Sequence, residues 1–98
     1  MEAENILKET IETVEIHKQL VSWVRRKKGQ KAAFNFAEKY KDIFRKKGLI
    51  EAIKFQNKMA EELGLVLTGP VFISTEERDG KLIITVLEKE VFEEKEVG

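Results

Sequence analysis

His17 is the side chain of this sequence best suited to acid–base or metal chemistry, and it is the chain's only histidine. The sequence contains no cysteine, so neither a Cys–His nucleophile pair nor a thiolate metal site can be assembled. His17 falls within the apolar arc of a predicted helix, close to Val14, Val21 and Val24. We therefore expect a hydrogen-bonded histidine in a core or an interface.

Paired glutamates are the other pattern that could do chemistry, and they occur at Glu61-Glu62, Glu76-Glu77 and Glu93-Glu94. Adjacent residues point to opposite faces of a strand and diverge by about 100° on a helix, so the two carboxylates of a pair do not converge. The glycines are isolated and form neither a P-loop nor a G-x-G-x-x-G motif. We expect no enzymatic activity, no metal or other cofactor and no small-molecule substrate.

A basic segment is the strongest chemical signal in the chain. Ten of the eighteen lysines and arginines lie between Arg25 and Lys47, against only Glu38 and Asp42, so the segment carries +8 in a chain of zero net charge. Acidic residues are concentrated instead in the last quarter, from Glu76 onwards. This segregation favours a polyanion or an acidic protein surface as the partner.

Five cations between Arg25 and Lys31 lie at a predicted helix-to-helix corner, where they can reach the phosphates of DNA or RNA without competing with core packing. Phe34 lies on the same helical stripe as Lys41 and Arg45, and an exposed aromatic among cations is typical of base stacking. Equally, Phe34 could pack under a partner chain. The predicted nucleic-acid-binding residues are Arg25, Arg26, Lys27, Lys28, Lys31, Phe34, Lys39, Lys41, Arg45 and Lys46.

The elements that must position these residues follow from apolar periodicity. Residues recurring every three to four positions predict helices over about 2–28, 31–47 and 49–63, each followed by a glycine. Gln56 falls at the centre of the apolar arc of the third helix, which predicts a buried amide that fixes the packing register.

After Gly69-Pro70 the period changes to two. This predicts strands over about 71–77 and 81–87, joined by a turn at Arg78-Asp79-Gly80. Residues 65–68 could add a short third strand, and the end from about 93 to 98 is predicted to be frayed. The expected fold is a single α+β domain over residues 1–98, with three helices followed by an antiparallel β-hairpin.

Two features predict self-association. Ile16 and Trp23, seven residues apart, form a second apolar stripe on the first helix, outside the stripe from Leu7 to Val21. The strand over 82–87 is apolar on both faces, and a lone two-stranded hairpin is marginal in water. A homodimer would cover both surfaces; alternatively, the three helices cover everything within one chain. The predicted self-association residues are Ile16, Trp23, Leu82, Ile84 and Val86.

The function that we expect is sequence-nonspecific contact with nucleic-acid backbone through the basic corner. The alternative is a protein–protein interaction or assembly module, in which residues 88–94 of one copy lie against Arg25–Lys31 of a neighbour. The order of elements over about residues 31–87 also resembles a winged helix. However, the third predicted helix exposes mixed, self-neutralised charge where that fold reads the major groove.

Lysine and glutamate dominate a charged fraction of 37%, a pattern typical of hyperthermophile proteins, although a Lys/Glu-rich mesophile protein is the alternative. No apolar run reaches about 18 residues and no signal peptide precedes the first helix, so we expect an intracellular, cytoplasmic protein. In length, Lys/Glu richness and the motif-free run Val24–Gly48, the sequence resembles small uncharacterised proteins of filamentous viruses that infect hot-acid crenarchaea. The resemblance implies a heat-stable protein of rare fold, in the host cell or the virion. It transfers no site residues.

Overall fold

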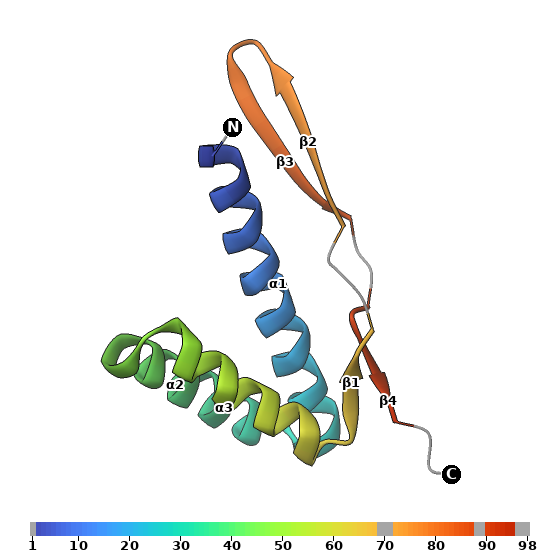
Figure 1. Ribbon diagram of the computed structural model, residues 1–98. Coiled ribbons are helices and arrows are strands. Elements are labelled where there is room, and N and C mark those ends of the chain that lie inside the picture. Colours follow the sequence, from blue (N-terminus) through green and yellow to red (C-terminus); the bar gives the residue numbers. More distant parts are fainter. Residues whose placement is uncertain (1, 69–71, 88–89, 96–98) are drawn as a thin grey trace.

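Three successive helices make up the first part of the chain and four short strands the second (Figure 1). The computed structural model describes residues 2–68, 72–87 and 90–95. The helices are α1 (Glu2–Lys28), α2 (Gln30–Lys47) and α3 (Leu49–Glu62). The fold class is the predicted one, three helices followed by antiparallel strands, and the predicted helix limits agree with these bounds to within one residue.

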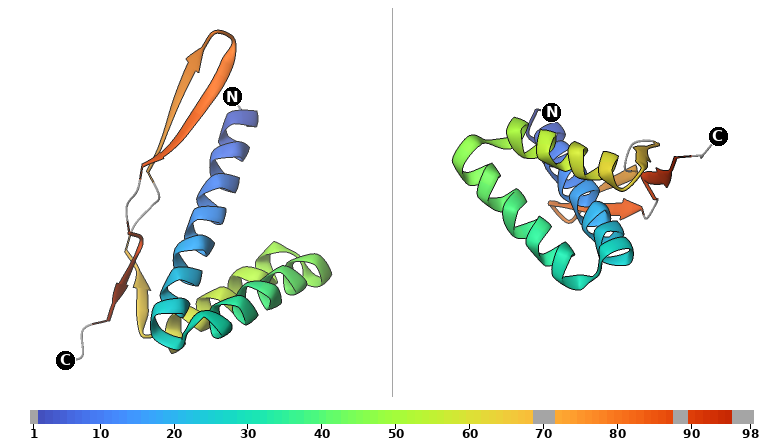
Figure 2. Two further views of the ribbon diagram at one scale, coloured as in Figure 1. Left: turned by 180° about the vertical axis from the view of Figure 1, so that it is seen from behind. Right: turned by 90° about the horizontal axis from the view of Figure 1, so that it is seen from below.

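Single glycines join the three helices. Gly29 and Gly48 have φ values of 95° and 94°, a region that residues with a Cβ rarely adopt, so the chain can reverse within one residue. As a result α2 and α3 lie side by side, and α1 packs across one end of the pair, so that the helices form an open V (Figures 1 and 2).

The strands are β1 (Leu65–Leu67), β2 (Phe72–Arg78), β3 (Lys81–Leu87) and β4 (Phe92–Glu94). Among the described residues they pair as two two-stranded antiparallel sheets, β2–β3 and β1–β4. The β2–β3 turn is the predicted Asp-Gly turn: Asp79 and Gly80 have φ values of 53° and 73°, and two positive values are what a type I′ hairpin requires.

The prediction of a frayed end was wrong for residues 93–95. Glu93 and Glu94 belong to β4, in register with Val66 and Leu65 of β1, and the Lys95 N–H donates to the Gly64 carbonyl at 2.7 Å. The short strand expected near residues 65–68 is present as β1, and it pairs with β4. Residues 96–98 lie outside the described part of the chain.

The core lies where the second half of α1 meets α2, α3 and the β1–β4 sheet. We call this region the packed end; its buried residues are Leu20, Val24, Ala33, Phe36, Ala60, Leu63, Leu65, Val91 and Phe92. The Gln19 side-chain oxygen accepts a hydrogen bond of 2.8 Å from the Val91 N–H, which fixes the start of β4 against α1. Burial of this apolar surface is the main term that stabilises the fold.

The opposite end of the molecule is open. The radius of gyration is 15.1 Å, against about 13 Å for a compact domain of this size. Figures 1 and 2 show the reason: the first half of α1, the α2–α3 joint and the tip of the β2–β3 hairpin all project from the packed end. None of the described helices combines the length and the apolar character needed to cross a membrane.

The expected packing face of α1 is only partly buried. Leu7 and Val14, predicted to lie on its main stripe, are 41% and 61% exposed, because no element in the described part of the chain packs over these two side chains. Ile16 and Trp23, predicted as an extra stripe, are instead partly buried against the core of the same chain.

Candidate functional site

The α1–α2 joint gathers the basic residues of the sequence at one corner. α1 ends in four consecutive cations, and α2 begins at Gln30 directly after Gly29. No side chain caps the N-terminus of α2, and its first turn contains no acid. The first N–H groups of a helix lack intrahelical partners and carry partial positive charge, so this end of α2 adds to the attraction for anions.

The cations of this corner differ in their partners. Lys27 Nζ lies 3.0 Å from Glu94 Oε1, and Lys28 Nζ lies 3.9 Å from Glu62 Oε2. The Arg26 guanidinium lies over the Trp23 ring, 4.0 Å from its centroid. In the described part of the chain Arg25 and Lys31 have no acidic partner, so their charges remain available. We call Arg25, Arg26, Lys27, Lys28 and Lys31 the basic corner.

Phe34 follows Lys31 by one helical turn and is 64% exposed. Residues three apart on a helix are surface neighbours, so the ring of Phe34 adjoins the basic corner. An aromatic of this exposure contributes little to the core, and its position permits stacking on a base or contact with another protein.

The remaining predicted cations lie farther along α2 and on two sides of it. Lys39 lies over the Phe55 ring on the α3 side, whereas Lys41 and Arg45 line a groove on the α1 side. Lys41 pairs with Glu38 at 3.6 Å and Lys46 with Asp42 at 3.2 Å. Lys31 and Lys41 are separated by ten residues, or about 15 Å along the helix. The ten predicted residues therefore do not form one surface.

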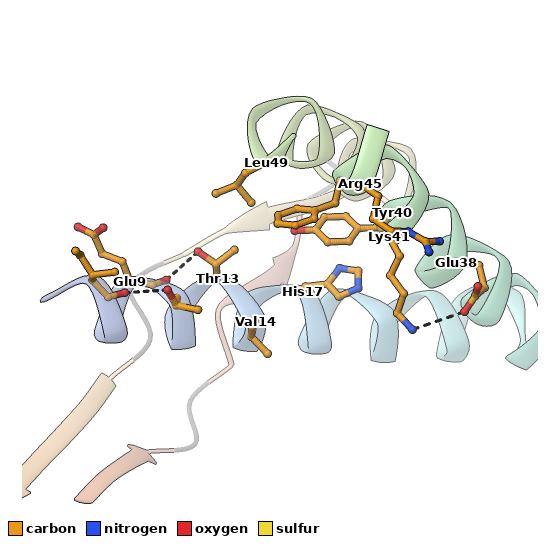
Figure 3. Close-up of a pocket in the computed structure, with 12 residues that line it drawn as sticks. Glu9, Thr13, Val14, His17, Glu38, Tyr40, Lys41, Arg45 and Leu49 are labelled. Atoms are coloured by element: carbon orange, nitrogen blue, oxygen red, sulfur yellow. Dashed lines mark hydrogen bonds and ion pairs between the residues drawn. The ribbon is translucent and has the colours of Figure 1, made fainter. Parts of the chain in front are cut away.

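A groove lies inside the V. It has a volume of about 830 Å³ and separates the first half of α1 from the end of α2 and the start of α3 (Figure 3). The lining residues are Ile6, Glu9, Thr10, Thr13, Val14, His17, Glu38, Tyr40, Lys41, Phe44, Arg45 and Leu49.

Both threonine hydroxyls of the groove donate to carbonyls of their own helix. Thr10 bonds to Ile6 and Thr13 to Glu9, each at 2.9 Å. Both hydroxyl protons are therefore satisfied within the helix.

His17 lies at the inner end of the groove, where its ring is stacked on Tyr40 with centroids 3.9 Å apart (Figure 3). Its Nδ1 lies 2.9 Å from Gln56 Oε1, so in the neutral ring Nδ1–H donates to the amide oxygen. Burial lowers the pKa of His17 below 6.5; the Gln56 hydrogen bond opposes this shift and the nearby Lys41 charge adds to it. Burial also raises the pKa of Tyr40.

Gln56 is 4% exposed, which confirms the predicted buried amide. Its bond to His17 joins α3 to α1, and His17 stacks on α2 through Tyr40. The contact connects all three helices, and it uses the histidine as a packing element, as the sequence predicted.

The predicted self-association residues fall into two groups. Ile16, Trp23 and Val86 pack against the core of their own chain, while Ile84 is half-buried and Leu82 is 46% exposed on the hairpin. Sequence reasoning missed the apolar side chains of the groove, which are Ile6, Val14, Phe44 and Leu49. The unusually wide apolar arc of α1 was the available signal, because one packing face could not use all of it.

Within the described residues no three His, Cys, Asp or Glu side chains come together as a metal site. Comparison of the chain with protein-family models, with curated proteins and with solved structures returned no match.

Proposed function

We propose that this protein binds the backbone of DNA or RNA through the basic corner, without much reading of sequence. The observation that carries the proposal is the gathering of five cations at one exposed helix joint, two of which, Arg25 and Lys31, have no acidic partner in the described residues. Phosphate contacts of this kind supply most of the affinity in nonspecific binding. The uncapped start of α2 adds N–H groups at the same place.

The ion pairs of Lys27 and Lys28 do not oppose this proposal. Lys28 and its partner Glu62 are about half exposed, as is Glu94 opposite Lys27. Exposed ion pairs contribute only about 0–1 kcal/mol, so either lysine can exchange its carboxylate for a phosphate at small cost. Phe34, one turn from Lys31, is placed to stack on an unpaired base, and we therefore expect a preference for single strands.

Fluorescence anisotropy with labelled duplex DNA, single-stranded DNA and single-stranded RNA, at low and moderate salt, tests the proposal. We expect binding that weakens steeply with salt. The double variant Arg25→Glu with Lys31→Glu should bind at least about tenfold more weakly than the unaltered protein. Phe34→Ala should weaken binding to single strands by about tenfold and to duplex much less.

The matched control reverses two exposed cations elsewhere, Lys58→Glu with Lys81→Glu, and gives the same change in net charge. If the control loses as much affinity as the corner variant, only overall charge matters and the corner is not a site. An unaltered protein that binds none of the three probes at low salt would refute the function itself.

A protein–protein interaction or assembly module is the second candidate. The observation that favours it is the apolar surface exposed at the open end, in the groove and on the hairpin. The pairing first expected for this module, between basic corner and acidic C-terminal quarter of different copies, is already partly met within one chain by Lys27 and Glu94.

A further inference from the structure

The groove exposes four large apolar side chains to solvent. Ile6, Val14, Phe44 and Leu49 lie on its two walls and are between 41% and 63% exposed. Isolated exposed apolar residues are common, but a contiguous apolar patch with a polar rim marks an interaction site. These four side chains line one groove, so we interpret them as a patch that marks an interaction site.

The two walls of the V carry opposite charge. Residues 2–16 of α1, which we call the α1 arm, contain five glutamates and one lysine, a net charge of −4. Residues 38–47 of α2, which we call the α2 shoulder, contain five cations and two acids, a net charge of +3. Glu9 lies on the first wall of the groove, and Lys41 and Arg45 lie on the second (Figure 3).

An occupant with an apolar strip and with acids on the side that faces the α2 shoulder would match the apolar side chains of the groove and the basic shoulder. The α1 arm is itself such a segment. Its exposed Leu7 and Val14, seven residues apart, form an apolar stripe between glutamates, and Leu7 does not line the groove of its own chain. The arm also extends over about 22 Å as a helix, and the α1 wall of the groove spans most of that length, from Ile6 to His17.

We propose that the groove is a homodimer interface whose occupant is the α1 arm of a second copy. A two-fold axis makes the contact reciprocal: each arm enters the V of the other molecule, with its apolar stripe on Phe44 and Leu49 and its glutamates facing Lys41 and Arg45. This inference concerns the open end only. It develops the assembly candidate and is independent of nucleic-acid binding at the basic corner.

Charge exchange between copies tests the arrangement. An arm variant, Glu9→Lys with Glu12→Lys, places cations against a basic shoulder; a shoulder variant, Lys41→Glu with Arg45→Glu, places acids against an acidic arm. Each variant alone is expected to dimerise at least about tenfold more weakly than the unaltered protein in sedimentation equilibrium. In an equimolar mixture the basic arm of one meets the acidic shoulder of the other, and both remaining walls keep their natural charges. The mixture should therefore recover the dimer.

Recovery on mixing requires a contact between two molecules, because charge reversal inside one chain cannot be repaired by another chain. A second pair of variants covers the case in which a double charge reversal fails to fold. Val14→Asp, on the groove wall, should give a monomer, whereas Ile83→Asp, at an exposed apolar position of the hairpin, should leave the dimer intact. Far-UV circular dichroism would check the helical content of each variant.

Three results would overturn the proposal: an unaltered protein that stays monomeric at high micromolar concentration, a mixture that remains monomeric, or a dimer that dissociates with Ile83→Asp and survives Val14→Asp. The last result would assign the interface to the hairpin. The corner variant Arg25→Glu with Lys31→Glu should still dimerise. Loss of nucleic-acid binding and loss of the dimer are thus separate outcomes.

Discussion

The two halves of α1 contain similar apolar residues in opposite surroundings. Leu20 and Val24, in the second half, have no exposed area, whereas Leu7 and Val14, in the first half, are 41% and 61% exposed. The residue types are the same, so the difference comes from what lies opposite. The second half faces α2, α3 and the β1–β4 sheet, whereas in the first half Val14 lines the groove and Leu7 lies outside it. Apolar periodicity identifies the face of a helix to be covered, but does not say which chain covers it.

Polar groups separate the two ends in the same way. At the packed end the hydrogen bonds join distant segments. The Val91 N–H donates to the Gln19 side chain, and the Thr68 N–H donates to the Val91 carbonyl at 2.7 Å. On the groove wall Thr10 and Thr13 bond only within their own helix. The open end therefore leaves apolar surface uncovered, but the two threonine hydroxyls need no partner from another molecule. The open end can therefore remain exposed to water until a partner covers its apolar surface.

The largest expected effect tests this contrast within one helix. Leu20→Ala should reduce the free energy of unfolding by about 3 kcal/mol, because it removes buried methyl groups and leaves a cavity in the packed end. Leu7→Ala is the matched control, with the same substitution on the same helix. It should cost less than about 0.5 kcal/mol, since its side chain is already partly in water. Urea denaturation at low protein concentration, where any dimer is dissociated, measures both.

Equal losses in the two variants would contradict the comparison. A large loss for Leu7→Ala at low concentration would mean that the first half of α1 is packed within the monomer. A loss that appears only at high concentration would instead sharpen the contrast, because it would place the missing cover on a second molecule.

The next effect, smaller than that of Leu20→Ala, is the pH dependence of stability that we expect from His17, which lies between the packed end and the open end. His17 is packed by Gln56 of α3 and by Tyr40, Phe36 and Lys41 of α2. Its pKa is lowered in the folded state, so the unfolded chain binds the proton more tightly. The contribution of His17 to the free energy of unfolding is therefore fully present above pH 6.5, and it falls as the pH drops from 6.5 towards the folded-state pKa.

Urea midpoints at pH 7.5 and 5.5, values on either side of about 6.5, measure this dependence. The unaltered protein should lose stability on acidification, and His17→Gln, which cannot titrate, should lose less. Lys41→Gln should also reduce the loss, because the Lys41 charge contributes to lowering the pKa. An unchanged acid response in His17→Gln would show that other groups govern stability in this range.

Local signals accounted for most of the fold. Gly29 and Gly48 end their helices because a positive φ is needed there, and the Asp79-Gly80 turn follows from the same preference. Such features depend on a few neighbouring residues, so one sequence suffices to predict them. The burial of Gln56 could also be predicted, because its neighbours at helical spacing are apolar.

Features that depend on distant segments could not be predicted in this way. β4 pairs with β1 and is joined to α1 by the hydrogen bond between Val91 and Gln19, which lies 72 residues earlier. No local pattern predicts these contacts. Likewise, the sequence suggested that residues 88–94 could meet the basic segment of a neighbouring copy, but it did not indicate that Glu94 reaches Lys27 within one chain or that Glu62 reaches Lys28. The roles of the basic corner and of the self-association residues remain predictions.

The smallest expected effect concerns the attachment of β4 to α1, which could depend on an ion pair or on apolar contacts. The ion pair between Lys27 and Glu94 joins β4 to α1 at 3.0 Å, beside the buried Val91 and Phe92. Glu94→Gln removes the charge and keeps the shape. We expect a change in the free energy of unfolding of less than about 0.5 kcal/mol, since Glu94 is 61% exposed and water screens the pair. A loss above about 1 kcal/mol, vanishing at high salt, would mean that the ion pair fixes β4. The packed end would then differ from the open end by its charges as well as by its apolar cover.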